Sequence, residues 1–88
     1  MRDITVCDVV ESRAGHDKGR LYLVIGAEGQ RLLLADGRIR TLARPKVKSQ
    51  KHVRPTARTE RAPATDKEIR TVLAAQAAQE KGDQFGER

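Results

Sequence analysis

The sequence predicts a mainly β fold, in which a small antiparallel barrel precedes one C-terminal α-helix. Four short segments with strand character follow one another between residues 5 and 42, with turns and no helical pattern between them. An alanine-rich run over residues 66–81 then has high helix propensity. The 88 residues suffice for one small domain with tails, close to the lower limit for a self-sufficient core.

The first three strands are predicted from runs of β-branched and aliphatic residues. Thr5–Ser12 is short and β-branched, and the polar loop Arg13–Gly19 follows it. Arg20–Ile25 is rich in Leu, Val, Ile and Tyr and has glycine on both sides, which is typical of a central strand. A turn over Gly26–Gly29 then leads into the third strand, Gln30–Ala35.

The fourth strand is predicted after the dipeptide Asp36-Gly37, which favours a two-residue type I′ hairpin turn. Residues 38–42 alternate polar and apolar with a period of two, the pattern of a half-buried strand. Arg38 and Arg40 share one face of that strand, because alternate side chains point the same way. That face is either part of a basic surface or an ordinary exterior position.

A basic segment follows the predicted fourth strand and is expected to close the barrel. Pro45 ends the block of strands, and residues 46–55 are basic, with Val53 as a short fifth strand. We therefore expect the barrel and its basic exit strand over residues 1–55. The composition of residues 56–65 predicts a linker.

The C-terminal helix is predicted by its capping residues. Thr65 is followed three residues later by Glu68, which is the spacing of a capping box, so the helix is expected over residues 66–81. Gly82 is expected to end it and to begin a flexible tail over residues 82–88. The sequence leaves three alternatives for this helix: it docks on the barrel, it engages a partner, or it has only marginal stability in isolation. Docking is favoured, through Ile69, Val72 and Leu73.

The positive charge is concentrated in one part of the chain. The formal net charge is +6, and residues 13–56 carry eleven cations and three acids. Residues 1–12 carry one cation and three acids, whereas residues 57–88 carry six of each. This distribution favours an anionic partner, meaning RNA, DNA or an acidic membrane surface.

The few cysteine and histidine residues argue against several classes of site. The single cysteine, Cys7, permits no intrachain disulfide, and with His16 and His52 it cannot supply the four ligands of a structural zinc site. No Ser/His/Asp or Cys/His arrangement for nucleophilic catalysis is present, so we expect neither an enzyme nor a cofactor. Cys7 is expected to be a small buried hydrophobe in the first strand.

The N-terminal sequence and the apolar runs indicate where the protein resides. The first residues lack the basic-then-apolar layout of a signal peptide. No apolar run approaches the roughly 20 residues that span a bilayer. We expect a cytoplasmic protein in a reducing compartment, with no membrane association.

Residues 12–26, SRAGHDKGRLYLVIG, form a glycine-bracketed cationic loop that runs into the apolar central strand. Together with LLLADGRIRTLARPKVKSQKH over residues 32–52, this loop resembles bacterial KOW-domain RNA-binding proteins. These are relatives of the KOW ribosomal proteins of the archaeal and eukaryotic large subunit. The resemblance covers about residues 5 to 54 and implies an SH3-like barrel that binds RNA. His16 stands where the resemblance implies a permanent cation, and an imidazole is not one.

The resemblance implies an RNA-binding surface made of the loop and the basic segment. Phosphate groups would be gripped by cations, with backbone N–H groups near Gly15 and Gly19 close to the RNA. The alternatives are a solvated turn for the loop and an edge strand protected by lysines for the basic segment. The predicted RNA-binding residues are Arg13, Gly15, His16, Lys18, Gly19, Arg20, Arg38, Arg40, Arg44, Lys46, Lys48, Lys51, His52 and Arg54.

The scarcity of aromatic residues bears on the kind of RNA. Proteins that bind single strands stack bases on exposed aromatics, whereas the chain has only Tyr22 and Phe85 and no Trp. Tyr22 lies in an apolar strand and is expected in the core. We therefore expect backbone recognition of structured RNA, ribosomal RNA above all, with the ribosome as a partner. The alternative is a protein-interaction adaptor associated with the ribosome or the transcription machinery, with the barrel or the helix as its docking surface, although a peptide-binding SH3 groove needs clustered aromatics.

Overall fold

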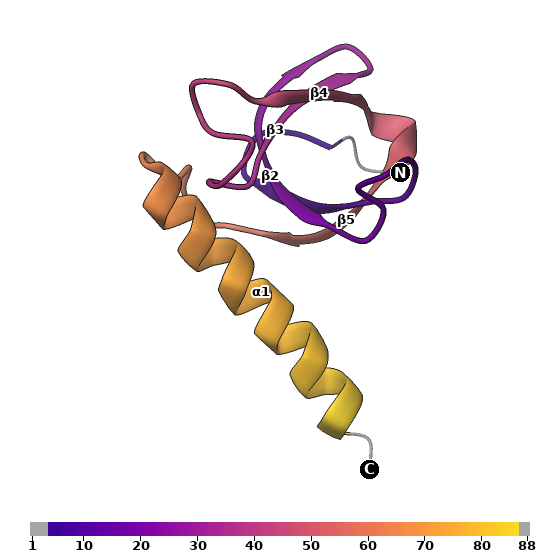
Figure 1. Ribbon diagram of the computed structural model, residues 1–88, viewed down its shortest axis with the longest axis vertical. Helices are drawn as coiled ribbons and strands as arrows, with labels where there is room; N and C mark the ends of the chain where they lie inside the picture. The colour runs from indigo at the N-terminus through magenta and orange to yellow at the C-terminus, as the bar shows by residue number, and fades with distance from the viewer. Residues whose placement is uncertain (1–3, 87–88) are drawn as a thin grey trace.

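Residues 4–86 are described by a computed structural model, in which five antiparallel strands form one curled sheet and a single helix follows (Figure 1). The order across the sheet is β4-β3-β2-β1-β5, so the first strand pairs with the last. A 3₁₀ turn, η1 (Gln50–His52), joins β4 to β5. The fold class predicted from the sequence, mainly β and barrel-like with a C-terminal helix, is confirmed. The strands are β1 (Asp8–Ser12), β2 (Leu21–Glu28), β3 (Arg31–Ala35), β4 (Lys46–Ser49) and β5 (Val53–Arg58).

The central strand β2 is apolar on both faces because each face is covered. Tyr22 and Val24 lie inside the barrel, whereas Leu23 between them points outward beneath the helix. The run of apolar residues in β2 is therefore that of a strand buried on two sides. The inner core contains Ile4, Val10, Tyr22, Val24, Leu32, Leu34 and Val53. The outer core contains Val9, Leu23, Ala35, Ile69 and Leu73.

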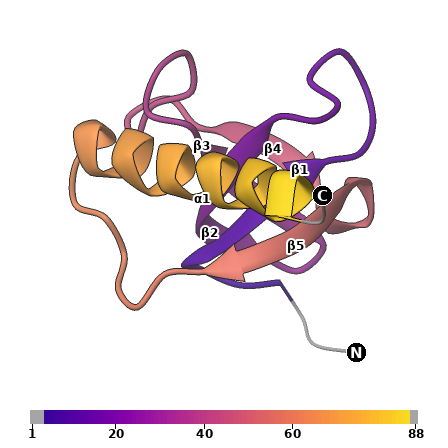
Figure 2. The same cartoon turned by 90° about the horizontal axis from the view of Figure 1, so that it is seen from below.

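Helix α1 (Asp66–Gly86) docks on the outer face of the sheet, as predicted (Figure 2). Ile69 is fully buried there, Leu73 is 8% exposed, and Val72 packs partly buried against them. The hydroxyl of Thr65 accepts a hydrogen bond from the Glu68 N–H at 3.1 Å, which is half of the predicted capping box.

The helix contacts the barrel through its first turns, and its C-terminal half projects past the strands (Figure 1). The helix does not end at Gly82 but continues to Gly86, so the prediction of a tail from residue 82 is wrong as far as residue 86. Residues 87–88 of the predicted tail and residues 1–3 of the predicted barrel lie outside the described residues.

The prediction of a fourth strand over residues 38–42 is wrong. Asp36 and Gly37 open a wider turn in which the Asp36 N–H and the Gly37 N–H both donate to the Arg40 carbonyl, at 2.8 and 3.1 Å. The strand that pairs with β3 is instead β4, which is the start of the predicted basic exit. The Asp36 carboxylate explains the difference, because it accepts hydrogen bonds from the N–H groups of Arg38 and Arg40, both at 2.9 Å.

Three other boundaries differ from the predictions. β2 continues through Gly26 by way of a bulge, and the two-residue hairpin turn is Gly29-Gln30, between the paired residues Glu28 and Arg31. β5 extends to Arg58, into the predicted linker.

Cys7 does not lie in a strand, contrary to prediction. It is half-buried in a tight turn before β1, with a φ of 80°. Its N–H donates to the Val24 carbonyl at 3.0 Å and its carbonyl accepts from the Thr59 N–H at 2.9 Å, which ties the turn to β2 and to the end of β5.

Within residues 4–86, α1 lacks the continuous apolar stretch that a membrane-spanning helix needs.

Candidate nucleic-acid interface

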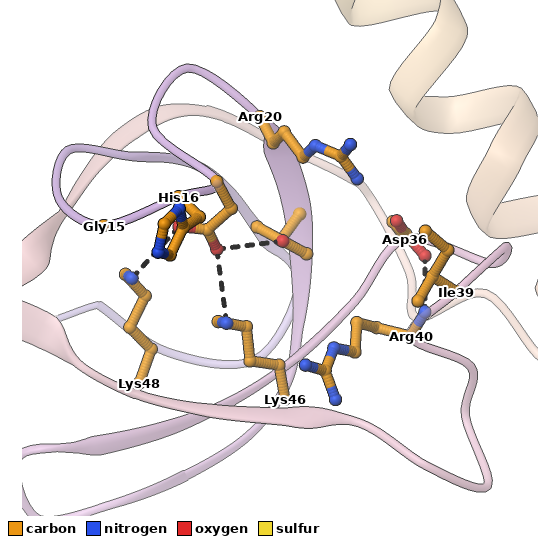
Figure 3. A pocket seen from close by; sticks show the side chains of 10 residues that line it. Gly15, His16, Arg20, Asp36, Ile39, Arg40, Lys46 and Lys48 are labelled. Atoms are coloured by element: carbon orange, nitrogen blue, oxygen red, sulfur yellow. Dashed lines mark hydrogen bonds and ion pairs between the residues drawn. The ribbon is translucent and has the colours of Figure 1, made fainter.

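A pocket of about 440 Å³ opens at one end of the barrel, where three segments distant in the sequence meet (Figure 3). The loop between β1 and β2, the turn after β3 and strand β4 each contribute to its walls. Four permanent cations and two carboxylates line it, so its net charge is positive before His16 is counted. Its lining residues are Gly15, His16, Asp17, Arg20, Tyr22, Asp36, Ile39, Arg40, Lys46 and Lys48.

The floor of the pocket is built around the carboxylate of Asp17. It accepts hydrogen bonds from the Ser12 hydroxyl at 2.8 Å, the Tyr22 hydroxyl at 2.9 Å and the Lys48 ammonium at 3.3 Å. The Lys46 ammonium lies 3.6 Å from Oδ2 of Asp17, the oxygen that also accepts from Tyr22. Figure 3 shows Lys46 and Lys48 extending from β4 toward the loop that carries Gly15 and His16. Asp17 thereby links the loop, the central strand and β4.

The surroundings of Asp17 fix its charge. Burial disfavours the ionised carboxylate and by itself would raise the pKa, but the hydrogen bonds from Ser12, Tyr22 and Lys48 and the charge of Lys48 outweigh it. The pKa of Asp17 therefore lies well below its ordinary value. Burial and the hydrogen bond to Asp17 raise the pKa of Tyr22 to about 12. The floor thus holds one permanent negative charge and a phenol that stays protonated.

Lys48 is engaged inside the protein rather than presented to solvent. Its side chain is 11% exposed, and its ammonium donates to the Ala14 carbonyl at 3.1 Å as well as to Asp17. Lys46 is more open, with a side chain 25% exposed. Of the two predicted phosphate ligands in β4, Lys46 is the more accessible, whereas Lys48 holds the loop in place.

Glycines shape the loop above the floor. Gly15 and Gly19 have φ values of 84° and 92°, which L side chains rarely adopt. The Gly19 N–H donates to the Ser12 carbonyl at 2.8 Å, so this N–H serves the loop itself. The main role of the two glycines is therefore to form the turn that brings Asp17 inward, rather than to present backbone N–H groups to a ligand.

Arg20 and Arg40 are the free cations of the pocket. Both are exposed, and among the residues whose side chains the structure describes neither makes an ion pair. They come from β2's entry and from the turn after β3, and Figure 3 shows them on the same side of the pocket as Asp36. Exposed guanidinium groups with no internal partner are suited to bind phosphate oxygens.

The turn after β3 is braced by helix α1. The Arg70 guanidinium donates to the Gly37 carbonyl at 2.6 Å, and the Leu42 N–H donates to the Asp66 carboxylate at 2.8 Å. A Cβ atom at Gly37 would collide with the Asp66 carbonyl oxygen, and the φ of 79° also favours glycine there. The helix therefore fixes the turn that carries Arg40.

The structure brings six of the predicted residues together in the pocket: Gly15, His16, Arg20, Arg40, Lys46 and Lys48. Others lie around the base of the loop, where the Arg13 N–H donates to the His52 carbonyl at 2.8 Å. Arg54 forms a 2.5 Å ion pair with Glu11 on the neighbouring strand. Lys18, Arg38, Arg44 and Lys51 are exposed outside the pocket.

Two functional features of the site were absent from the predictions. Asp17 was predicted only as a part of the loop motif, and its role as the centre of the floor depends on Lys48, 31 residues away. Ile39 was predicted as a strand residue and instead lies at the pocket with 71% of its surface exposed. An acid flanked by cations in a glycine loop is the one sequence pattern that could have indicated the Asp17 cluster.

A larger groove of about 860 Å³ lies between the linker and the first turns of α1. Its charged lining residues are Glu60, Arg61, Lys67 and Glu68, which balance. The groove therefore gives no preference for an anion.

Among the described residues no cluster of His, Cys, Asp or Glu could hold a metal ion.

The sequence matches no protein-family model and no curated protein. The resemblance to KOW proteins, expected from the loop, the Asp36-Gly37 dipeptide and the basic segment, stays a prediction.

Proposed function

We propose that the protein binds RNA without catalysing a reaction, by capturing phosphates of structured RNA at the pocket and on the exposed cations outside it, Lys18, Arg38, Arg44 and Lys51. The observation that carries the proposal is the convergence of Arg20, Arg40 and Lys46 from three segments onto one positively charged concavity. The KOW resemblance supports RNA as the anionic partner and ribosomal RNA as its source.

The proposed mechanism is electrostatic. Arg20 and Arg40 contact phosphates directly, and Lys46 contributes from the floor. Each phosphate that a cation neutralises releases a counterion, so affinity falls as the salt concentration rises. Lys48 acts indirectly, because its ammonium holds Asp17 and the Ala14 carbonyl.

The test compares two variants that remove the same charge at different places. One is Arg20→Gln with Arg40→Gln, in the pocket. The control is Arg61→Gln with Lys67→Gln, in the charge-balanced groove. The affinity for a structured RNA hairpin is measured by fluorescence anisotropy over a series of salt concentrations.

The pocket variant is expected to bind more weakly and with a shallower log–log salt slope, by about 0.7 to 0.9 for each phosphate that the variant no longer neutralises. The control variant is expected to keep the slope of the unmodified protein. Absence of salt-dependent binding in the unmodified protein, or an equal change of slope in both variants, contradicts the proposal.

A further inference from the structure

An exposed aliphatic side chain lies among the charges of the pocket. Ile39 is 71% exposed, more than the other large hydrophobic side chains that are exposed in the described part of the chain, Val47 at 56% and Leu33 at 39%. A single exposed apolar side chain is ordinary on a protein surface. Leu33 and Val47 at least face each other across β3 and β4, whereas Ile39 lines a cationic pocket.

The turn that carries Ile39 is held in place before any ligand binds. The carboxylate of Asp36 accepts the N–H groups on either side of Ile39, from Arg38 and Arg40, both at 2.9 Å. Arg70 of the helix donates to the Gly37 carbonyl at 2.6 Å. A ligand that packs against Ile39 therefore need not order this backbone, which lowers the cost of binding.

The pocket combines the groups that an unpaired nucleotide requires. A nucleobase has an apolar face and a polar edge, and its phosphates are anionic. Ile39 offers an apolar surface, Arg20 and Arg40 offer donors to phosphate, and the carboxylate of Asp36 offers an acceptor for a base N–H group. The volume of about 440 Å³ is in the range of small-molecule sites.

We propose that the pocket receives one unpaired nucleotide of a structured RNA, with the base against Ile39 and the flanking phosphates on Arg20 and Arg40. The proposal rests on the proposed RNA-binding function and adds a preference within it. Proteins that read structured RNA reach bases chiefly in bulges and loops, where a base can leave the stack. A fully paired stem offers phosphates but no base to the pocket.

The test uses two RNA hairpins in which the strands are joined by the same non-nucleotide linker, so neither has unpaired bases in a terminal loop. In one, the stem is fully paired; in the other, one nucleotide of the stem lacks its partner and forms a bulge, so this RNA carries one phosphate fewer. Affinities are measured at one fixed salt concentration for the full chain and for Ile39→Ser. Val47→Ser is the matched control, because Val47 is also exposed and lies outside the pocket.

The unmodified protein is expected to bind the bulged hairpin more tightly. Ile39→Ser is expected to lose roughly fivefold in affinity for the bulged hairpin, the scale of an apolar contact of this size, and to bind the paired hairpin unchanged. Val47→Ser is expected to keep the preference. Because both side chains are exposed, thermal melts of the two variants are expected to match the unmodified protein.

Three outcomes overturn the inference. Equal affinity of the unmodified protein for the two hairpins, or an equal loss in Ile39→Ser and Val47→Ser, removes the nucleotide from the pocket and leaves phosphate binding intact. Binding to neither hairpin at any salt concentration overturns the proposed function as well.

Discussion

The substitution Asp17→Asn tests whether the floor of the pocket holds the barrel and loop together. Asn has nearly the same shape and keeps one oxygen acceptor, but it carries no charge. The Asp17 side chain is 11% exposed and accepts from Ser12, Tyr22 and Lys48. After the substitution the Lys48 ammonium, also 11% exposed, has no opposite charge beside it.

We expect the free energy of unfolding at pH 7 to fall by about 2–3 kcal/mol. A hydrogen bond to a charged group contributes roughly 1.5–3 kcal/mol, and a cation left buried without its partner costs more. The cost of burying the carboxylate, which the variant avoids, offsets part of this loss. For a domain of this size such a change lowers Tm by on the order of 10–20 °C.

The dependence on pH has a definite sign. Because the pKa of Asp17 is lower in the folded protein than in the unfolded chain, its contribution is complete above the unfolded value of about 3.9. That contribution is lost as the pH falls from there through the folded pKa. The difference in unfolding free energy between the unmodified protein and Asp17→Asn is therefore expected to be constant from pH 5 to 7 and to narrow below pH 4.

Urea unfolding followed by circular dichroism measures both quantities. The control is Glu11→Gln, which makes the same chemical change in an ion pair whose Arg54 partner is 54% exposed, and is expected to cost under about 1 kcal/mol. Equal costs for the two variants, or a difference that does not change below pH 4, would show that the charge of Asp17 does not stabilise the fold.

Three further substitutions, one of them with a control, test the helix and its contact with the pocket. Gly37→Ala is expected to lower the free energy of unfolding by about 1–2 kcal/mol because of its positive φ, and by more because of the clash with Asp66. Its control, Gly19→Ala, has open space around it and is expected to lose only the amount due to its positive φ. Urea unfolding of the two variants gives the difference, and equal losses would contradict the docking of Gly37 against the helix. Ile69→Ala is expected to cost about 2–5 kcal/mol by the same measurement, because Ile69 is fully buried, and a loss under about 1 kcal/mol would contradict its place in the core. Thr65→Ala is expected to cost about 1 kcal/mol and to speed hydrogen exchange in the first turn of the helix; unchanged exchange there would contradict the cap.

Short sequence patterns predict those parts of the fold that depend on interactions between residues close in the sequence. The central strand, the helix start at Thr65 and the docking residue Ile69 follow from apolar spacing and capping chemistry within a few residues. The fold class could therefore be predicted from the sequence.

The error in the fourth strand has a specific physical origin. Residues 38–42 and 46–49 both alternate polar and apolar, so periodicity alone cannot choose between them. Asp36 decides the choice by accepting two backbone N–H groups that a strand would need. Gly37, lying against the helix, decides it further.

The candidate site was predictable as a set of cations but not as a geometry. The contact between Asp17 and Lys48 spans 31 residues, and it removes one predicted phosphate ligand from the surface. The exposure of Ile39 follows from the turn that replaces the predicted strand. Both depend on tertiary contacts that no short segment specifies.

Amide chemical-shift mapping by NMR locates the RNA on the protein and so tests whether RNA is held at the pocket. On titration with a bulged RNA hairpin, we expect the largest shifts in residues 15–20, in residues 36–40 and at Lys46, and unchanged amide resonances in the groove over residues 59–72. Shifts concentrated in the groove, with the pocket unchanged, would contradict binding of RNA at the pocket.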